Sequence, residues 1–410
     1  MELKSSNKKT AAGLIPGDWD VTTVGDEFTV ELGKMLDSER NFGSAKPFLG
    51  NRSVQWGRID VRDLGSLRMS KADLVKYRLK HGDLLVCEGG EVGRAAIWNA
   101  PIEECYYQKA LHRLRPIRGY NSNYMLAVLE QLAKNGGLEN FVTQTSIAHL
   151  PKEKFVNVPI PCPPPVEQLA IAAALGNVDA LLSAQEALID KKRVIKQGVM
   201  QELLTGKRRL PGFSGDWEVK QLGEVATFLK GKGLPKSALS EFGAEPCIHY
   251  GELFTRHPES ISQILSFTDR VVDAFRSVVN DVLMPTSDVT PRGLARASCV
   301  NVDGIILGGD ILVIRPDAKR IFGPFLSFLI RYEETQVLQL VTGSTVFHLY
   351  GSDMKKFTFA MPPVDEQKAI TEALSGMTNE IMALETKRAK TALLRQGMMQ
   401  ELLTGKTRLA

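Results

Sequence analysis

The chain has 410 residues, a length that predicts two to four domains, each able to enclose a hydrophobic core. With 43% hydrophobic and 24% charged residues, the composition is typical of a globular protein and excludes a largely disordered or low-complexity chain. The net charge of +4 does not by itself indicate a nucleic-acid-binding protein. Five scattered cysteines without a CxxC pair, and no uninterrupted run of 18 apolar residues, favour free thiols, a cytoplasmic location and no membrane span.

The sequence contains an internal duplication. Residues 163–210 align with 362–409 without a gap, and QGVMQELLTGKRRL at the end of the first copy matches QGMMQELLTGKTRL at 12 of 14 positions. Shorter repeats precede them: GDWDV and GDWEV, TSIAHL and STVFHL, and Asp83-Leu84-Leu85 with Asp281-Val282-Leu283. We therefore expect four segments, a first globular domain (1–162), a central long helix (163–210), a second globular domain (211–361) and a C-terminal long helix (362–410).

The two repeated segments are predicted to be long helices. PPPVEQ and PPVDEQ place proline and an acidic residue where helices begin, and LLTGK places Gly206 or Gly405 where helices end. An apolar stripe at helical spacing predicts antiparallel pairing of the helices, with close backbone approach at Gly198 and Gly397; an alternative has each helix lying on its own globular domain. The stripe comprises Leu182, Leu188, Ile195, Val199 and Leu203 in the first copy, and Ile381, Leu384, Leu394, Met398 and Leu402 in the second.

The globular domains are predicted to mix strands and helices. Buried strands are expected at 82–86 and 281–284 and, ended by proline, at 111–116 and 311–316. Helices are expected at 124–132 and 325–332. Because these elements recur while the intervening loops differ, the sequence predicts one scaffold that presents two different surfaces.

No catalytic or metal-binding motif was found. The sequence contains no GxGxxG, HExxH, GxSxG or NPPY-like tetrapeptide, and its six histidines lack ligand spacing, so His149 and His348 are interpreted as structural. Gly405-Lys406-Thr407 imitates the end of a phosphate-binding loop but is better explained as a helix cap, and Glu366-Gln367-Lys368 as a helix start. We predict no catalytic, cofactor-binding or metal-binding residue.

The paired helix starts, the paired MQELLTGK ends, the GDW motifs and the HL motifs together resemble the specificity (S) subunits of type I restriction-modification systems, over essentially the whole chain. The resemblance implies an α+β fold: two mixed α/β target recognition domains, joined by two long helices that form an antiparallel coiled coil with pseudo-twofold duplication. It implies a non-catalytic subunit that reads a bipartite, asymmetric site in double-stranded DNA, with a helical ruler setting the spacer. It also implies docking of two methyltransferase (M) subunits and of restriction/translocase (R) subunits, with S-adenosylmethionine, ATP and Mg on those partners.

Candidate DNA-binding residues were chosen because they are polar or basic and lie in turn-like or glycine-rich stretches. In the first domain they are Lys46, Asn51, Arg52, Arg94, Lys109, Gln144, Thr145 and Ser146. In the second they are Lys230, Lys232, Lys236, Arg256, Arg292, Arg296, Ser344 and Thr345. For any one of them, simple surface solvation is the competing interpretation.

Two other functions remain open from the sequence. A stand-alone modification enzyme is disfavoured by the missing cofactor and amide-binding motifs. A duplicated-arm scaffold without DNA specificity would share the repeats but would not retain DNA of a particular sequence.

Overall fold

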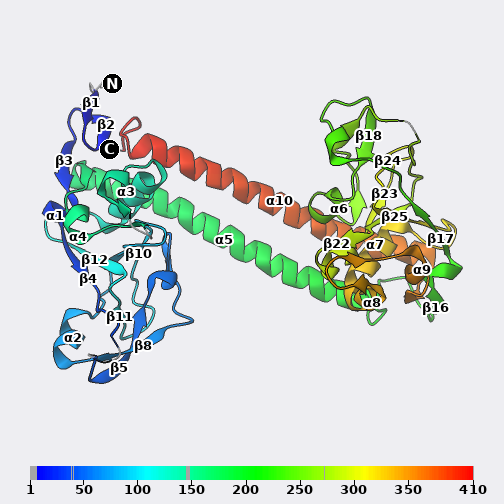
Figure 1. Cartoon of the computed structure of the whole chain (residues 1–410), viewed down its shortest axis with the longest axis horizontal. Coiled ribbons are helices and arrows are strands. Elements are labelled where there is room, and N and C mark those ends of the chain that lie inside the picture. Colours follow the sequence, from blue (N-terminus) through cyan, green and yellow to red (C-terminus); the bar gives the residue numbers. More distant parts are fainter. Residues whose placement is uncertain (1–6, 38, 40, 145–147, 272, 410) are drawn as a thin grey trace. The chain divides into compact units, whose positions relative to one another are not determined.

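The computed structural model describes residues 7–37, 39, 41–144, 148–271 and 273–409, and it divides into two compact units (Figure 1). Unit 1 comprises 1–186 and 387–410, and unit 2 comprises 187–386. Each unit therefore combines one globular domain with a part of each long helix. The four-segment division of the sequence stays a prediction, because the two units are defined by contacts and each combines separate stretches of the chain.

The elements of unit 1 are many and short apart from the two long helices. Its strands are β1 (Asn7–Thr10), β2 (Gly13–Pro16), β3 (Asp20–Thr23), β4 (Phe28–Leu32), β5 (Ser44–Leu49), β6 (Val54–Gln55), β7 (Arg58–Ile59), β8 (Gly65–Met69), β9 (Leu84–Cys87), β10 (Ala95–Ile97), β11 (Tyr106–Tyr107), β12 (Leu111–Pro116), β13 (Thr143–Gln144), β14 (Ala148–His149) and β15 (Pro159–Cys162). Its helices are α1 (Val24–Glu27), α2 (Lys71–Lys76), α3 (Ser122–Lys134), α4 (Lys152–Phe155) and the first part of α5 (Pro165–Leu204).

Unit 2 follows the same plan. Its strands are β16 (Glu218–Gln221), β17 (Ala226–Lys230), β18 (Glu245–Ile248), β19 (Ser260–Ile261), β20 (Ser266–Thr268), β21 (Val282–Pro285), β22 (Ser287–Asp288), β23 (Ser298–Val300), β24 (Ile306–Leu307), β25 (Ile311–Pro316), β26 (Thr342–Gly343), β27 (Phe347–His348) and β28 (Thr358–Met361). Its helices are α6 (Glu252–Thr255), α7 (Gly323–Tyr332), α8 (Glu334–Leu340), α9 (Gly351–Met354) and the first part of α10 (Val364–Leu402).

The sheets of the two units correspond strand by strand. Unit 1 has the order β10-β9-β12-β4 and unit 2 the order β23-β21-β25-β17, with β19 added beyond β23. A second sheet, β11-β5-β8 in unit 1 and β24-β18-β20 in unit 2, contains one parallel and one antiparallel pair in both cases. The predicted strands and the helices α3 and α7 lie where the sequence placed them, so the duplicated mixed α/β fold is confirmed.

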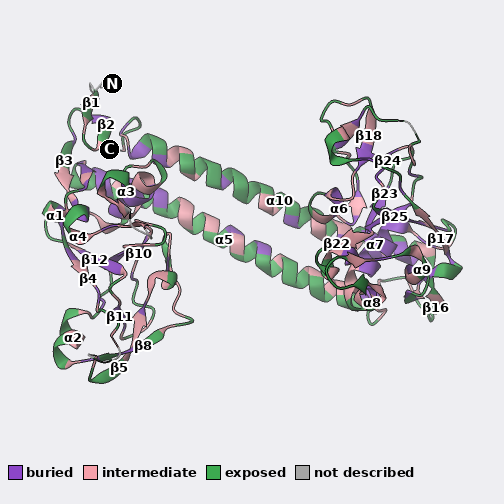
Figure 2. Ribbon diagram, viewed as in Figure 1, coloured by how far each residue is buried: buried purple, intermediate pink, exposed green. Residues whose placement is uncertain are grey.

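The main core of each unit includes the beginning of one long helix and the end of the other (Figure 2). In unit 1, Ile171 and Leu175 from the start of α5 pack with Leu402 from the end of α10. In unit 2, Ile370 and Leu374 from α10 pack with α5 residues. Burial of these apolar side chains anchors the helix ends to the sheets, at roughly 2 kcal/mol per fully buried side chain.

The repeated motifs meet in a contact that we call the Trp–Glu–Arg clamp. In unit 2, the indole N–H of Trp217 donates to Glu366 over 3.1 Å, and Arg209 donates to the same carboxylate over 2.6 Å while covering the Trp217 ring. Glu366 is fully buried. The GDW motif, a helix start and the end of the other helix are thereby joined, and a buried carboxylate is neutralised by charge-assisted hydrogen bonds.

Unit 1 contains the same clamp with one additional acid. Trp19 and Arg408 donate to Glu167 over 3.0 and 2.7 Å, and Arg408 also binds Asp18 over 2.9 Å. These bonds hold the pKa of Asp18 below its ordinary value, with the Arg408 hydrogen bond as the largest cause. The glycines that follow the helices, Gly206 and Gly405, have positive φ angles of 71° and 64°, as expected for residues that end helices.

The long helices pair in antiparallel fashion within each unit, and the predicted stripe, with its polar interruptions, forms part of the pairing. In unit 1, the buried Gln185 donates to Thr391 over 3.2 Å. In unit 2, Lys192 contacts Glu380 and Arg193 contacts Glu385, each at 2.6 Å. The predicted stripe therefore holds in part: Leu203, Ile381 and Leu402 are buried, and the polar residues that interrupt it, Gln185 and Thr391, are buried with it. Of the predicted stripe, Leu188, Ile195 and Leu394 are exposed.

The expected close approach at the two helix glycines was wrong. A Cβ atom built on Gly198 or on Gly397 would meet nothing within 4 Å. Neither glycine is therefore required by packing, and each lowers helix stability by about 1 kcal/mol relative to alanine.

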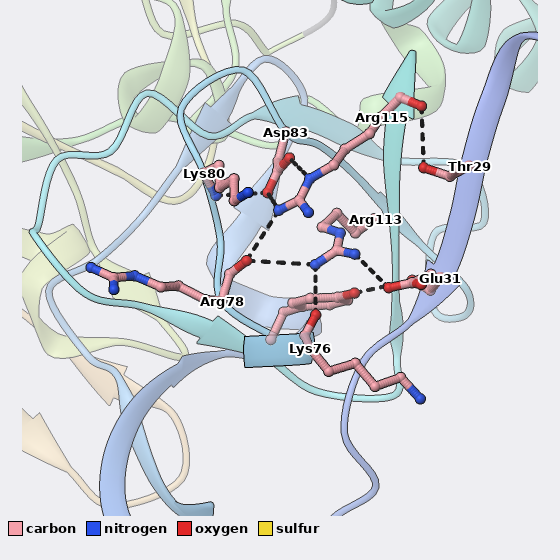
Figure 3. A network of polar contacts seen from close by, with 9 residues as sticks. Thr29, Glu31, Lys76, Arg78, Lys80, Asp83, Arg113 and Arg115 are labelled. Atoms are coloured by element: carbon pink, nitrogen blue, oxygen red, sulfur yellow. Dashed lines mark hydrogen bonds and ion pairs between the residues drawn. The ribbon is translucent and has the colours of Figure 1, made fainter. Parts of the chain in front are cut away.

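The repeated residues Asp83 and Asp281 each bind an arginine of a neighbouring strand, and Figure 3 shows the polar network around Asp83 in unit 1. In unit 1, Nε and Nη2 of Arg115 donate to the Asp83 carboxylate over 2.5 and 2.8 Å. The backbone N–H of Lys80 donates to the same carboxylate over 2.7 Å. In unit 2, Arg315 binds Asp281 in the same bidentate manner, at 2.7 and 2.8 Å. The network fixes the turn before a central strand against the neighbouring strand, so this repeat is structural.

Helix α5 is long and apolar enough to cross a membrane by length and composition alone, with an 18-residue window of mean hydropathy 1.2. Ile171, Ala172 and Leu175 of its second and third turns belong to the core of unit 1, and 22% of that window is buried. The absence of a membrane span stays a prediction. Among the described residues, no group of three His, Cys, Asp or Glu side chains could hold a metal ion.

Candidate DNA interface

The HL motif lies in a small hairpin of each unit, β13–β14 in unit 1 and β26–β27 in unit 2, which we call the edge hairpin. In unit 2, β27 pairs with both β22 and β26, and Leu349 is fully buried with its N–H donating to the carbonyl of Thr286 over 3.0 Å. In unit 1, Leu150 is equally buried and its N–H donates to Glu88 over 2.7 Å. The buried leucine thus fixes the hairpin in both copies, and of the residues next to it Tyr350 is exposed, whereas His149, Pro151 and His348 are partly buried.

In unit 2 the candidates Ser344 and Thr345 connect β26 to β27 and are exposed. Lys230 ends β17, is 65% exposed in its side chain and approaches Asp310 at 3.8 Å. Arg292 lies in the short 3-10 helix that contacts β22 and β27, where it pairs with Glu334 at 2.9 Å. The structure therefore gathers part of the predicted set around one hairpin.

The other candidates of unit 2 lie along different loops. Lys236 and Arg256 line one cavity of about 490 Å³, and Arg256 and Arg296 line another of about 530 Å³. Arg256 also pairs with Glu252 at 3.3 Å. Lys232 pairs with Asp273 at 2.6 Å on the exposed surface. These residues share a basic character but do not converge on the hairpin.

In unit 1, two candidates are engaged in holding a loop. The side-chain amide of Asn51 donates to the carbonyl of Gly89 over 2.8 Å, and Arg94 donates to the carbonyl of Asn51 over 3.0 Å and to Glu91 over 3.2 Å. These bonds tie the 3-10 helix at 51–53 to the loop that follows β9. Their structural role is clear from the geometry, and a role in DNA contact stays a prediction.

Of the remaining candidates of unit 1, three are described with their side chains. Lys46 pairs with Glu104, whereas Arg52 and Lys109 are exposed. Gln144 belongs to β13, which pairs with β14. Thr145 and Ser146 lie outside the described residues.

The hairpin of unit 1 lies beside a titratable group whose environment differs from that of unit 2. Burial raises the pKa of Glu88, against the opposing charges of Lys109 and His149. The corresponding position in unit 2 is Thr286, which carries no charge. Equivalent backbone positions thus present different chemistry, as expected if the two units read different sequences.

Sequence reasoning missed an exposed aromatic residue next to the HL motif. His348 stacks on Tyr350 with ring centroids 6.1 Å apart and planes 22° apart, and Tyr350 is 53% exposed. His348 was interpreted as structural and Tyr350 was not considered. The signal that could have found it is the aromatic residue directly after the repeated HL, where the first copy has Pro151.

Comparison with known proteins agrees with this geometry. The family model for the type I restriction modification DNA specificity domain matches twice, at residues 16–191 and 214–393. The chain therefore belongs to the family of type I restriction-modification DNA specificity proteins, and the resemblance inferred from the motifs is confirmed.

Individual relatives extend over the full chain. The "Putative type I restriction enzyme MjaX specificity subunit" of Methanocaldococcus jannaschii is 24% identical, with 98% of this chain and 96% of that protein covered. The type I restriction enzyme MjaVIII specificity subunit of the same organism is 23% identical, with 99% and 97% covered. Among solved structures, the type I S subunit from M. genitalium matches with a TM-score of 0.61 at 15% identity, covering 94% of this chain and 96% of that one.

Proposed function

We propose that the chain is the DNA-recognition subunit of a type I restriction-modification complex and that each unit reads one half of a bipartite DNA site. The observation that carries the proposal is the pair of equivalent frameworks, each within a family-matched region, whose edge hairpins present different residues. Two readers with different surfaces recognise an asymmetric site, because the major groove displays a distinct donor and acceptor pattern for each base pair.

The partners follow from family membership and from the helices. Double-stranded DNA is the ligand, two methyltransferase subunits dock on the chain, and restriction/translocase subunits join for cleavage. Apolar side chains on the helices remain exposed, which favours a protein partner on these surfaces; they include Leu188, Val194 and Ile195 on α5 and Leu393 and Leu394 on α10.

The chain itself is proposed to be non-catalytic and cytoplasmic. S-adenosylmethionine, ATP and Mg would be bound by the partner subunits. The absence of catalytic motifs from the sequence supports this division of labour. A modest net charge of +4 suits a subunit that shares the neutralisation of DNA phosphates with its partners.

The helices are proposed to set the number of unread base pairs between the half-sites. Seven residues added to each helix, after Ala184 in α5 and after Thr391 in α10, would lengthen both by about 10 Å and the spacer by about three base pairs. Methylation sequencing measures the spacer directly. An unchanged spacer in a complex that still methylates DNA would contradict the ruler.

The function is tested by selecting DNA from a random library with the chain and its cognate methyltransferase subunit. Sequencing of the retained DNA should give two short conserved blocks separated by a fixed spacer. Retention without a preferred sequence would instead support the duplicated-arm scaffold. The purified chain alone should transfer no methyl group from S-adenosylmethionine; measurable transfer would revive the stand-alone enzyme.

A further inference from the structure

A cavity of about 530 Å³ lies in unit 2 beside the edge hairpin. Its walls come from β17, from the segment after β21, from β27 and from α9. The side chains used in the argument below are Phe228, Lys230, Ser287, His348, Tyr350 and Lys355. Gly351 allows α9 to close on β17, since a Cβ atom at this position would come within 2.9 Å of the Phe228 Cβ.

The aromatic pair at the cavity, His348 and Tyr350, is positioned by main-chain pairing and by the buried leucine between them. His348 pairs through its main chain with Ser287 and Thr342, and the buried Leu349 anchors the next residue. Tyr350 keeps 53% of its surface exposed although it stacks on His348. A rigid, exposed aromatic residue with a polar end is typical of recognition surfaces, because it offers apolar area at a low entropy cost.

Two lysines also line the cavity. Lys230 is 65% exposed in its side chain, with Asp310 at 3.8 Å, and the Lys355 ammonium lies 6.0 Å from the Phe228 ring centroid. Two lysines against one aspartate leave a net charge of +1 among these three side chains. This net positive charge attracts a phosphate group and repels a cationic ligand.

The same place in unit 1 keeps the histidine, because His149 aligns with His348, but it differs at the positions of Lys230, Ser287 and Tyr350. Thr29 donates to the carbonyl of Arg115, and Thr227 donates to the carbonyl of Arg315, so the two threonines are equivalent. Three residues further along the same strands, Leu32 is therefore the counterpart of Lys230. The N–H groups of Leu150 and Leu349 donate to Glu88 and Thr286, so the residues that follow these acceptors, Gly89 and Ser287, are equivalent. The residues that follow the two leucines, Pro151 and Tyr350, are equivalent as well. A lining needed for folding would be present in both copies, so the unit 2 lining points to a ligand.

We propose that this cavity is a DNA contact point of unit 2 and that Tyr350 is a specificity-determining residue for one half-site. Lys230 and Lys355 hold a backbone phosphate, the ring of Tyr350 and the hydroxyl of Ser287 meet base edges, and the repeated His348 supports the ring of Tyr350. The inference rests on the proposed function, since it names where the second unit touches its half-site.

The test uses the full chain with its methyltransferase subunit and a DNA library randomised in both half-sites. Tyr350→Ala should lower selectivity about tenfold at one or more positions of one half-site and leave the other unchanged, whereas Tyr350→Phe should keep most of it. Phe242→Ala, which removes another exposed aromatic side chain of unit 2, is the matched control and should change neither half-site.

The lysine is tested by salt dependence. Lys230→Ala should weaken binding equally for all sequences and lower the slope of log affinity against log salt by about 1. Asp310→Asn should tighten binding, because it removes the acid that offsets Lys230. Wild-type selectivity in Tyr350→Ala, or a wild-type salt slope in Lys230→Ala, would overturn the inference. If the unaltered complex itself selects no sequence, the proposed function fails instead, and the two failures are thus distinguishable.

Discussion

The two units of this chain are built on one framework and differ where that framework meets solvent. Both have the same two sheets, the same buried HL leucine, the same Trp–Glu–Arg clamp and the same aspartate–arginine pair. At the edge hairpin they diverge, and Pro151 in unit 1 corresponds to Tyr350 in unit 2. Repeated residues therefore report on folding, and the positions that changed after duplication report on recognition.

The clamp gives the largest expected difference between the units. Glu366→Ala should lower the free energy of unfolding by about 3 kcal/mol, because Arg209 loses its buried carboxylate partner. Glu167→Ala should cost less, since Arg408 keeps Asp18. Urea unfolding of the full chain measures both losses of unfolding free energy.

Glu202→Ala, which removes an exposed partner of Arg208, is the control and should cost less than 1 kcal/mol. Equal losses for Glu366→Ala and Glu167→Ala would show that Asp18 does not compensate.

The next largest expected effect concerns equivalent positions of the two long helices, Arg395 in unit 1 and Lys196 in unit 2. Arg395 in unit 1 binds both Glu130 and Asp179, so Arg395→Ala should cost about 2 kcal/mol by leaving the buried Glu130 with Lys134 alone. Its counterpart Lys196 shares Glu259 with Arg331, which remains after Lys196→Ala.

We therefore expect Lys196→Ala to cost about half as much as Arg395→Ala in the same urea experiment. A larger loss for Lys196→Ala would mean that the cation–π contact of Lys196 with Phe328 dominates over the ion pair.

The smallest effect concerns the buried polar pair between the helices of unit 1. Thr391→Val should cost about 1 kcal/mol, because Gln185 loses its acceptor while the oxygen of its own amide already lacks a partner. Gln185→Leu introduces the residue found at the aligned position Leu384 and should be neutral or slightly stabilising. Thermal unfolding distinguishes the two variants, and destabilisation by Gln185→Leu would show that the amide stabilises the pair.

Much of the fold was predictable because duplication marks its structural residues. The helix bounds, the central strands and α3 and α7 all follow from repeated motifs and local signals in the sequence. The helix interface was predictable only in part, because Gln185 and Thr391 interrupt the apolar stripe and yet are buried, while Leu188, Ile195 and Leu394 of the stripe are exposed.

The candidate interface was only partly predictable for a related reason. Composition identifies Lys230 and Arg94 equally well, yet one is exposed beside a cavity and the other is bonded within a loop. Tyr350 was missed because the aligned repeat ends at the HL motif, and the difference between Tyr350 and Pro151 directly after it was not considered. The stacking of Tyr350 on His348 and its exposure are known only from the structure.

The central claim, that each unit reads one half-site independently, is tested most directly by exchanging residues 211–361 for the corresponding domain of another family member. Methylation sequencing of cells that carry the exchanged chain and the methyltransferase subunit would give the new recognition site. The account predicts that one half-site changes while the other half-site stays the same. A change in both half-sites, or in neither, would contradict it.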